Sequence, residues 1–449
     1  MVTHTRDAEL GNACPRSLSR LTELAKEDCE RKFTSIAHFL TLESLYAAFR
    51  SLRKDASAVV DQITYADYAT QARENNKRLW ERLNDRMYRA QPLHRIHLPK
   101  EDGSERPISI PALEDKIVQK ATVRLLNAIY ETNFLACSNR FRPGRGPHDA
   151  LDEVDRIHFR QPIFYVLELD ITSYFDTIVR ALLMEMIEKQ IGDGSILRLI
   201  RKWINVGVID EGHLLVSETG TGQGQVISPL LANIYLHHVL DVWFENEVKP
   251  RLTDNAFEVR YADDALLWFQ YQEDAQKVLK VLSKRFLKYG LTLHPERTRP
   301  IEFGRSALLK AEQAKGQSAT FDFLGLTHFT ARGRRGKFTV KSKTMKRRLK
   351  RGLTAVATWC KAHRHDPVVE QQAILNAKLR GHYQYYGRSS NYRCLWQFYR
   401  GVQRSWRKWL SRCSRGTPVT WDKYALLFRR HPLVRPQIVH TWADSRSRT

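Results

Sequence analysis

The stretch FEVRYADDALLWF, residues 257–269, decides the fold of the central part of this chain. Two segments rich in aromatic and aliphatic residues flank a short polar pair, Asp263-Asp264, and this pattern predicts a strand, a tight turn and a second strand. Adjacent carboxylates repel each other unless a positive charge neutralises them, and a divalent metal ion would do so. Asp-Asp also occurs in ordinary hairpin turns, where both groups are hydrated, so this stretch alone leaves both interpretations open.

A second stretch adds a carboxylate and favours the metal. Residues 164–170, FYVLELD, predict a strand that ends at Asp170, at a position where Val or Thr would be ordinary. Carboxylates from two neighbouring strands can hold a pair of Mg²⁺ ions in octahedral oxygen coordination. Two ions about 4 Å apart suit an in-line phosphoryl displacement, because one activates the attacking hydroxyl and the other stabilises the leaving pyrophosphate.

Further out, helices and strands interleave from about residue 92 to residue 330. The pair Asp102-Gly103 predicts a hairpin turn between two short apolar segments, and apolar spacing predicts a helix over about 113–130. A Gly-rich loop leads into a helix expected from about Pro229, and strand-like segments follow at 291–303 and 321–330. These short strands do not form a βαβ repeat, so the sequence predicts an α+β domain built on an antiparallel sheet.

The charge of the chain is concentrated at its C-terminal end. The 449 residues carry 73 Lys and Arg against 49 Asp and Glu, a net charge of +24, and residues 332–449 hold 29 of the basic residues but only 4 acidic ones. A positive potential confined to one region predicts a polyanionic partner, most commonly nucleic acid. No apolar stretch approaches the roughly 18 to 20 residues of a membrane span, so we expect no membrane partner and a cytoplasmic location.

The basic run over 332–351, RGRRGKFTVKSKTMKRRLKR, has 11 basic residues in 20 and no acidic one. A solvated helix face normally intersperses acidic residues, so this run favours phosphate contact, with a merely solvated face as the alternative. From Gly333 the chain is expected to be helical to its end. The candidate nucleic-acid-binding residues in this run are Lys346, Arg347, Arg348, Lys350 and Arg351.

Over roughly residues 40–440 the chain resembles the reverse transcriptases encoded by bacterial group II introns, also called maturases. The motifs that carry the resemblance occur in the family's order: RPISIP, NRFRPGRGPHDA, LELDITSYFDTI, TGTGQGQVISPLLANIYL, RYADD, KYGLTLHPERT, FDFLGLTH and LRGHYQYYG. The resemblance implies a right-hand polymerase, with fingers and palm followed by a helical thumb and maturase domain. The expected divisions are a helical segment at 1–90, fingers and palm at 91–331, the thumb and maturase domain at 332–415, and a basic extension at 416–449.

The resemblance also assigns roles to individual residues. It implies that Asp170, Asp263 and Asp264 are catalytic and bind two Mg²⁺ ions, with the backbone carbonyl of Ile171 as an additional ligand. Asp176, in the same motif as Asp170, is interpreted as a capping or bracing residue.

Nucleotide and nucleic-acid contacts are implied as well. Lys100 and Arg106 would grip the triphosphate, and Gln223 would contact the nucleotide. Phe175 would lie under the incoming sugar and exclude a ribose 2′-OH, with packing in the core as the alternative. The remaining assignments are arginines: Arg142 and Arg145 would contact template or primer, and Arg297, where the family usually has Lys, would lie near the leaving pyrophosphate.

Two positions depart from the common form of the family's Gly-rich motif. Gly222 stands where Pro is frequent, and Gln225 stands where Gly is frequent. If position 225 required a backbone conformation that only glycine adopts, polymerase activity would be reduced.

The function implied is an RNA-directed DNA polymerase that uses deoxynucleoside triphosphates, an RNA template and a DNA primer. The family also binds group II intron RNA, assists its splicing and copies it into target DNA during retrohoming. Two alternatives stay open: a related reverse transcriptase with a host role such as phage defence, and a polymerase-inactive RNA-binding splicing factor.

Overall fold

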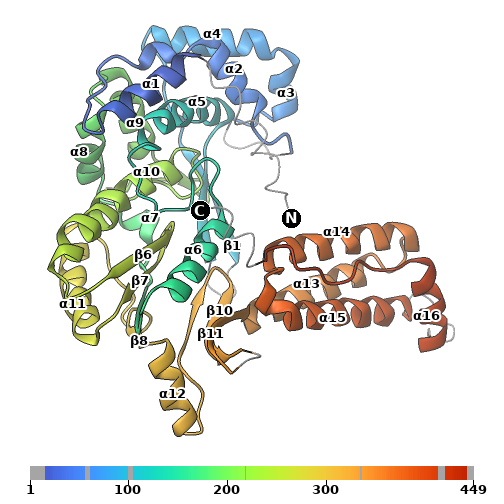
Figure 1. The fold of residues 1–449 in the computed structure, drawn as a ribbon. Coiled ribbons are helices and arrows are strands. Elements are labelled where there is room, and N and C mark those ends of the chain that lie inside the picture. The colour runs from blue at the N-terminus through green and yellow to red at the C-terminus, as the bar shows by residue number, and fades with distance from the viewer. Residues whose placement is uncertain are drawn as a thin grey trace.

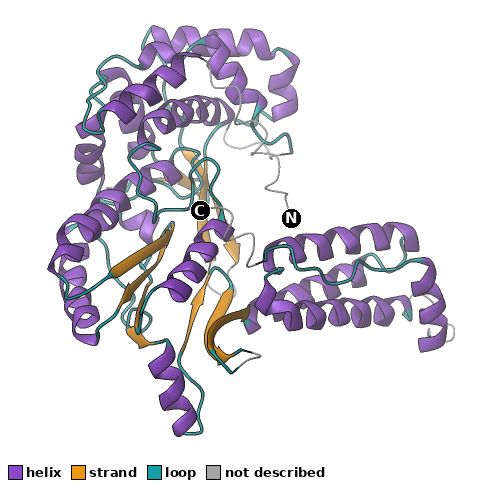
Figure 2. Ribbon diagram, viewed as in Figure 1, coloured by secondary structure: helices purple, strands orange, loops and turns teal. Residues whose placement is uncertain are grey.

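The computed structural model of the chain describes residues 16–55, 61–99, 105–217, 219–333, 336–412 and 420–441. These residues form an α+β structure in which helices surround three small sheets (Figures 1 and 2). The expected turn at Asp102-Gly103 and the candidate Lys100 lie outside the described residues. Within the described ranges, no helix combines the length and the apolar character that crossing a bilayer requires.

The central sheet has the strand order β6-β7-β3-β8, and all its pairings are antiparallel. Leu167 and Leu169 face the largest hydrophobic core, whereas Val166 faces a second core with Trp268, so the sheet is covered on both faces. The predicted strand-turn-strand over 257–269 and the strand before Asp170 are confirmed, but little of the expected strand at 291–303 is extended. The bounds are β3 Tyr165–Leu169, β6 Ala256–Tyr261, β7 Asp264–Phe269 and β8 Pro300–Glu302.

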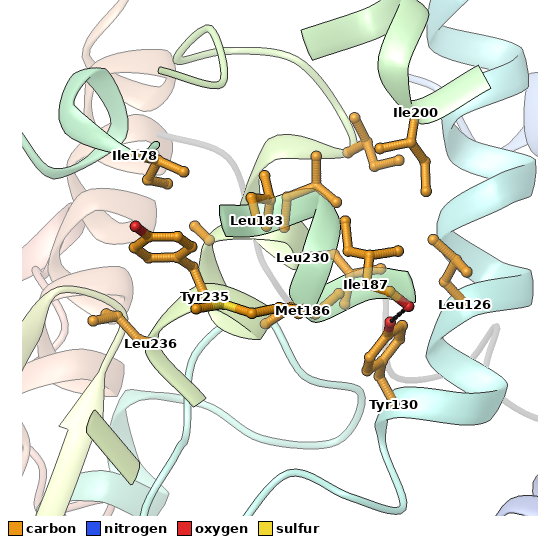
Figure 3. Close-up of a cluster of buried hydrophobic side chains, with 14 of the residues drawn as sticks. Leu126, Tyr130, Ile178, Leu183, Met186, Ile187, Ile200, Leu230, Tyr235 and Leu236 are labelled. Carbon is orange, nitrogen blue, oxygen red and sulfur yellow. Dashed lines mark hydrogen bonds between the residues drawn. The ribbon is translucent and has the colours of Figure 1, made fainter. Parts of the chain in front are cut away.

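Helices pack on one face of this sheet and enclose the largest core. Figure 3 shows Leu126, Ile187 and Leu230 meeting there, and the Tyr130 hydroxyl donates to the Ile187 carbonyl over 3.4 Å. The helices expected over 113–130 and from about Pro229 are confirmed. The bounds are α5 Leu113–Tyr130, α8 Arg180–Gln190, α9 Gly194–Asn205, α10 Ser228–Leu236, the π-helical turns His237–Asp241 and Phe244–Val248, the 3₁₀ turn Lys249–Arg251, and α11 Gln272–Lys288.

A second sheet has the strand order β2-β1-β4-β5. The expected β1–β2 hairpin is confirmed, with Leu98 opposite Arg106. Sequence reasoning missed β4 and β5, which join this sheet through a parallel β1–β4 pairing. The bounds are α1 Arg16–Glu27, η2 Ala37–Phe39, α2 Leu42–Arg50, α3 Tyr65–Thr70, α4 Ala72–Asn84, β1 Leu93–Pro99, β2 Glu105–Ile110, β4 Val208–Asp210 and β5 His213–Leu215.

The third sheet corrects two expectations. The segment 321–330 is not one strand, because Leu324 and Gly325 take positive φ values of 49° and 79° and form a turn. The chain after Gly333 is not helical at first, since β11 pairs with β10 along its whole length. The expected boundary at 331/332 therefore falls inside a hairpin: charge changes there, but the alternating burial of β11 continues the sheet. The bounds are α12 Arg305–Gln313, β9 Thr320–Phe323, β10 Leu326–Arg332 and β11 Phe338–Thr344.

The C-terminal helices form a bundle with a core of its own (Figure 1). Leu379, Leu395 and Trp406 are fully buried in it, and Tyr424, from the expected extension at 416–449, packs against the same core. The described part of that extension is therefore a component of the bundle. The bounds are α13 Lys346–Ala362, α14 Val368–Tyr386, η6 Ser389–Asn391, α15 Tyr392–Leu410 and α16 Trp421–Arg430.

The LRGHYQYYG segment and the arginine after it attach the bundle to the rest of the molecule. Arg388 is buried and donates to Asp152 over 2.8 Å and to Asp155, both on α6 (Pro147–Arg160). The Tyr385 hydroxyl donates to the Leu324 carbonyl over 3.0 Å. These contacts join the end of α14 and the following Arg388 to α6 and to the turn at Leu324.

A buried histidine in the second core predicts acid sensitivity. Burial lowers the pKa of His158 to about 3 from 6.5, so below pH 6.5 the unfolded chain binds a proton that the folded chain does not. The unfolding free energy therefore falls as the pH drops below 6.5, and the protonation of this histidine in the unfolded chain should lower it by about 1.4 kcal/mol at pH 5.5. We expect the unfolding free energy of His158→Phe to fall less than that of the parent between pH 7.5 and 5.5, in denaturant titrations. The same change at exposed His365 should leave the parent's pH dependence intact; equal dependence in His158→Phe and the parent would contradict the assignment.

Candidate active site

Three carboxylates converge at one end of the central sheet. Tyr261 pairs with Asp264, which leaves Ala262 and Asp263 as a two-residue turn, and Ala262 has a left-handed φ of 62°. On the other side of β7, Leu169 pairs with Ala265, so Asp170 lies next to Asp264 across the strands. The register thus brings together the three aspartates that the sequence singles out.

The electrostatics of this cluster fit a bound cation. Asp264 lies at the exposed edge of the sheet, yet desolvation by the surrounding chain raises its pKa. The negative charges of Asp263 and Asp170 add to this effect, and together the three causes raise the pKa of Asp264 to about 6. Desolvation raises the pKa of Asp263 too, and Asp170 adds to the effect, whereas Arg140 and Arg106 oppose it. The local excess of negative charge and the all-oxygen donor set match a hard divalent ion such as Mg²⁺.

Asp170 is held from both its side chain and its backbone. Arg297 Nη1 donates to Asp170 Oδ2 over 2.7 Å, and the Asp170 carbonyl accepts from the His294 amide over 2.8 Å. This backbone bond is one of two that form an antiparallel β-bridge between Ile171 and Leu293. In the second bond the Thr172 amide donates to the Thr292 carbonyl, so both bonds flank Ile171 and neither uses its carbonyl. This leaves the Ile171 carbonyl available as the additional ligand that the sequence suggests.

Arg260, within the RYADD motif, is a residue whose role sequence reasoning missed. Its side chain is fully buried, and it binds Asp241 in bidentate fashion, Nε to Oδ1 over 2.7 Å and Nη2 to Oδ2 over 2.6 Å. Its Nη1 donates to the carbonyl of Ala262 over 3.0 Å and to Asn233 Oδ1 over 3.1 Å. Arg260 therefore holds the strained turn that carries Asp263. The alternation of strand residues would have placed it on a face, but not against Asp241, which is distant in sequence.

A second group of possible metal ligands lies behind this turn. One ligand atom from each of Cys137, Asp241 and Glu258 lies within 4.8 Å of the others. Both Asp241 oxygens already accept from Arg260, and burial, together with the charge of Asp241, raises the pKa of Glu258 well above its usual value. Because Asp241 is already occupied by Arg260, this group is better interpreted as a support for the turn.

The candidate nucleotide contacts surround the carboxylates. Arg106 is exposed on β2, and its positive charge lowers the pKa of Asp263, so it lies on the side of the three carboxylates. Phe175, in α7 (Tyr174–Thr177), is half-buried and touches the largest core, so a core contribution and a sugar contact are both compatible with its position. Gln223 is half-buried, and its backbone carbonyl accepts a hydrogen bond from the Ser109 amide of β2 over 2.6 Å. Asp176 is exposed at the start of α7.

The arginine loop requires a correction. Arg142 is buried rather than exposed to nucleic acid. Its Nε and Nη2 donate hydrogen bonds to the Glu131 carboxylate, and its Nη1 donates to the carbonyls of Leu135 and Ser138. Arg145 is half-buried and donates to the Ala136 carbonyl over 2.8 Å. These two arginines hold the loop.

Arg140, in the same loop, is the arginine that faces the carboxylates. Its guanidinium lies 4.8 Å from the ring centre of Tyr261, and its charge lowers the pKa of both Asp263 and Asp264. Because both Arg140 and Arg142 are basic residues of one loop, residue type alone could not separate the exposed arginine from the buried one.

The expected basic cluster at the start of α13 divides into two parts. Lys346, Arg347, Lys350 and Arg351 are exposed, whereas Arg348 is half-buried, and its charge lowers the pKa of Asp264. The start of α13 therefore directs Arg348 toward the carboxylates, whereas the other four cations lie on the surface.

Comparisons with known proteins agree with this arrangement. The family described as "Reverse transcriptase (RNA-dependent DNA polymerase)" matches residues 98–328, slightly more than half of the chain. The group II intron-encoded protein LtrA of Lactococcus lactis subsp. cremoris is 30% identical over 280 residues, which are 60% of this chain and 46% of LtrA. Protein YkfC of Escherichia coli K12 is 40% identical over 210 residues, 40% of this chain and 55% of YkfC.

An uncharacterized 91 kDa protein in a cob intron of Schizosaccharomyces pombe is 39% identical over 155 residues, 34% of this chain and 19% of its own length. The chain thus spans about half the length, or less, of these relatives. The family match covers all three aspartates and the strands that carry them. This chain belongs to the reverse transcriptase family.

Proposed function

We propose that this protein is an RNA-directed DNA polymerase that also binds and helps to splice a group II intron RNA. The convergence of Asp170, Asp263 and Asp264 at one sheet edge, in a chain of the reverse transcriptase family, carries the proposal. A polymerase-inactive splicing factor would have no need of all three carboxylates.

Different residues of the chain would contribute to different parts of the polymerase reaction. The three carboxylates and the Ile171 carbonyl would hold two Mg²⁺ ions, which supply Lewis-acid activation of the primer 3′-OH and of the triphosphate. Arg106 and Arg140 add positive charge on the substrate side, where the triphosphate carries negative charge. The hydroxyl then displaces pyrophosphate from the α-phosphate of a deoxynucleoside triphosphate, paired to an RNA template.

The helical bundle α13–α16 would serve as thumb and maturase region. The relatives of the chain include a protein named group II intron-encoded and another from a cob intron, which supports an intron RNA as partner and target DNA as the eventual substrate. A related enzyme with a host role is the alternative, and finding no intron ribozyme sequence in the DNA beside the gene would favour it.

Primer extension tests the polymerase proposal. The purified chain is mixed with a DNA primer on an RNA template, the four deoxynucleotides and Mg²⁺, and full-length complementary DNA is the expected product. Absence of extension across a wide range of Mg²⁺ concentrations would contradict the polymerase assignment. Accelerated splicing of the flanking intron RNA by the same preparation is the corresponding test of the maturase proposal.

Replacing Phe175 with Val tests its position under the sugar. The smaller side chain leaves room for a 2′-OH, so we expect the preference for deoxynucleotides over ribonucleotides to fall by at least about tenfold. The measurement is kcat/KM for each nucleotide on the same template. Leu182→Ala, which also removes a side chain from the edge of the largest core, should leave the preference unchanged. An unaltered preference in Phe175→Val would assign the ring to the core alone.

The exposed cations of α13 predict part of the RNA affinity. Replacing Lys346, Arg347, Lys350 and Arg351 with Gln keeps helix propensity and leaves Arg348 in place. With about −0.7 in log–log salt slope per phosphate contact, four contacts predict a slope flatter by roughly 3. Filter binding of intron RNA at several salt concentrations measures it.

A control with the same change in net charge replaces four exposed lysines of α11 with Gln: Lys277, Lys280, Lys284 and Lys288. We expect this control to keep nearly the parent's affinity and slope. Should the α13 variant behave like the α11 control, the α13 cations are only a solvated surface.

A further inference from the structure

The loop that carries Gln223 contains the two departures from the family's motif, and we propose that Gly222 and Gln225 act as one compensating unit that positions this loop. The Gln223 loop is defined as residues 220–227. The inference rests on the proposed polymerase function, since it concerns how the nucleotide-contact residue Gln223 is held.

Position 225 does not require glycine. Gln225 is not among the residues with a positive φ, and it is buried, with 3% of its surface exposed. The condition under which activity would be reduced is therefore not met. Instead the glutamine takes up interior space that a glycine would leave empty.

The Gln225 amide connects three elements. Its Nε2 donates to the Trp203 carbonyl of α9 over 3.1 Å and to the Thr221 carbonyl over 3.2 Å, and its Oε1 accepts from Gln119 Nε2 of α5 over 2.9 Å. Gln119 is fully buried and returns to the loop by accepting from the Val226 amide over 2.9 Å. Buried amide groups without partners are costly, so these bonds specify one arrangement of the loop.

Gly222 makes this arrangement possible. Its φ is 60°, a left-handed conformation that proline cannot adopt, and a Cβ at this position would lie 2.8 Å from Gln225 Nε2. Any other residue at 222 would push the amide away from its partners. The two positions are thus sterically dependent on each other: the glutamine amide requires the glycine.

Backbone hydrogen bonds from this loop connect it to the segments that carry the candidate nucleotide contacts. The Thr221 amide donates to the Phe175 carbonyl over 3.0 Å, and the Gln223 carbonyl accepts from Ser109 of β2 over 2.6 Å. A shift of the Gln225 amide would therefore displace Gln223, and with it the contacts to α7 and β2. Gly222 and Gln225 are positioning residues in this scheme.

A double-mutant cycle tests the coupling. Gly222→Ala, Gln225→Ala and the double variant are compared by single-nucleotide incorporation. A Cβ at position 222 would also lie 2.9 Å from Leu93 Cδ1. Gly222→Ala carries this contact and the same backbone strain in both backgrounds, so these costs cancel, and only the clash with the amide differs. We expect Gly222→Ala to lower kcat/KM for the nucleotide at least about fivefold more in the parent than in the Gln225→Ala background, mainly through KM. Equal factors in the two backgrounds would overturn the proposal.

A shape-matched variant separates positioning from folding. Gln225→Met keeps the buried volume but removes the three hydrogen bonds, so KM for the nucleotide should rise about tenfold, while the Kd for template-primer stays within a few-fold. An unchanged KM would overturn the positioning role.

Thermal unfolding of all the variants distinguishes this inference from the polymerase assignment. If the parent does not extend primers, the polymerase proposal fails, but a smaller Tm loss from Gly222→Ala in the Gln225→Ala background would still support the pair. Folding of Gly222→Ala only in that background is likewise supporting. Equal Tm losses, or failure to fold in both backgrounds, would contradict the compensation.

Discussion

Asp263→Asn should abolish primer extension, with at least about a thousandfold loss of kcat, while RNA binding stays within a few-fold of the parent. The substitution removes one negative charge from the three-carboxylate cluster and replaces a proposed metal ligand with a neutral amide. Asp263 lies in the turn between β6 and β7, and its substitution leaves the exposed cations of α13 unchanged. Rapid-quench extension and filter binding on one preparation measure both effects.

The matched control is Asp85→Asn, at an exposed site after α4. It changes the net charge by the same amount and should extend primers like the parent. Residual activity of Asp263→Asn within about tenfold of the parent would contradict the assignment of Asp263 to the metal centre. The same logic applies to Asp170→Asn, which also releases Arg297 from its ion pair.

Arg260→Met should produce the second large effect, a loss of about 3 to 5 kcal/mol in unfolding free energy. Both residues of the Arg260–Asp241 pair are fully buried, so the substitution leaves Asp241 charged without its partner. The carbonyl of Ala262 also loses its donor, and the left-handed turn that carries Asp263 loses its support. Denaturant unfolding gives the stability change.

A double variant separates stability from positioning. Arg260→Met combined with Asp241→Leu removes both charges, so much of the lost stability should return. Extension should stay about a hundredfold below the parent, because the turn still lacks its support and small misplacements of catalytic groups are costly. Full recovery of kcat in the double variant would show that Arg260 contributes only to folding.

The sequence predicted the elements that carry the site, because the strands around Asp170 and Asp263 have local signals. The strand-turn-strand over 257–269 depends on apolar residues that flank a polar pair, and the structure buries these residues in the two cores. Strand β11 of the third sheet escaped prediction because it contains lysines, and its strand conformation depends on pairing with β10. Charge predicted a partner for this region but not its secondary structure.

The arginines show the same limit at the level of single residues. Arg140 and Arg142 are two positions apart, yet one faces the carboxylates and the other is buried against Glu131. Arg348 differs from its neighbours on α13 in the same way. What separates them is tertiary position, which a residue's type and its local spacing do not contain.

Metal binding by the three aspartates can be measured directly with Mn²⁺, whose electron paramagnetic resonance signal from the free ion disappears on binding. The parent is titrated with Mn²⁺ in the presence of RNA template, a chain-terminated DNA primer and the next deoxynucleotide, beside a variant with Asp170, Asp263 and Asp264 all changed to Asn. We predict that the parent binds about two more ions than the variant, as a two-metal phosphoryl-transfer site requires. Equal numbers of bound ions in a folded variant that still binds template-primer would contradict the carboxylate metal centre.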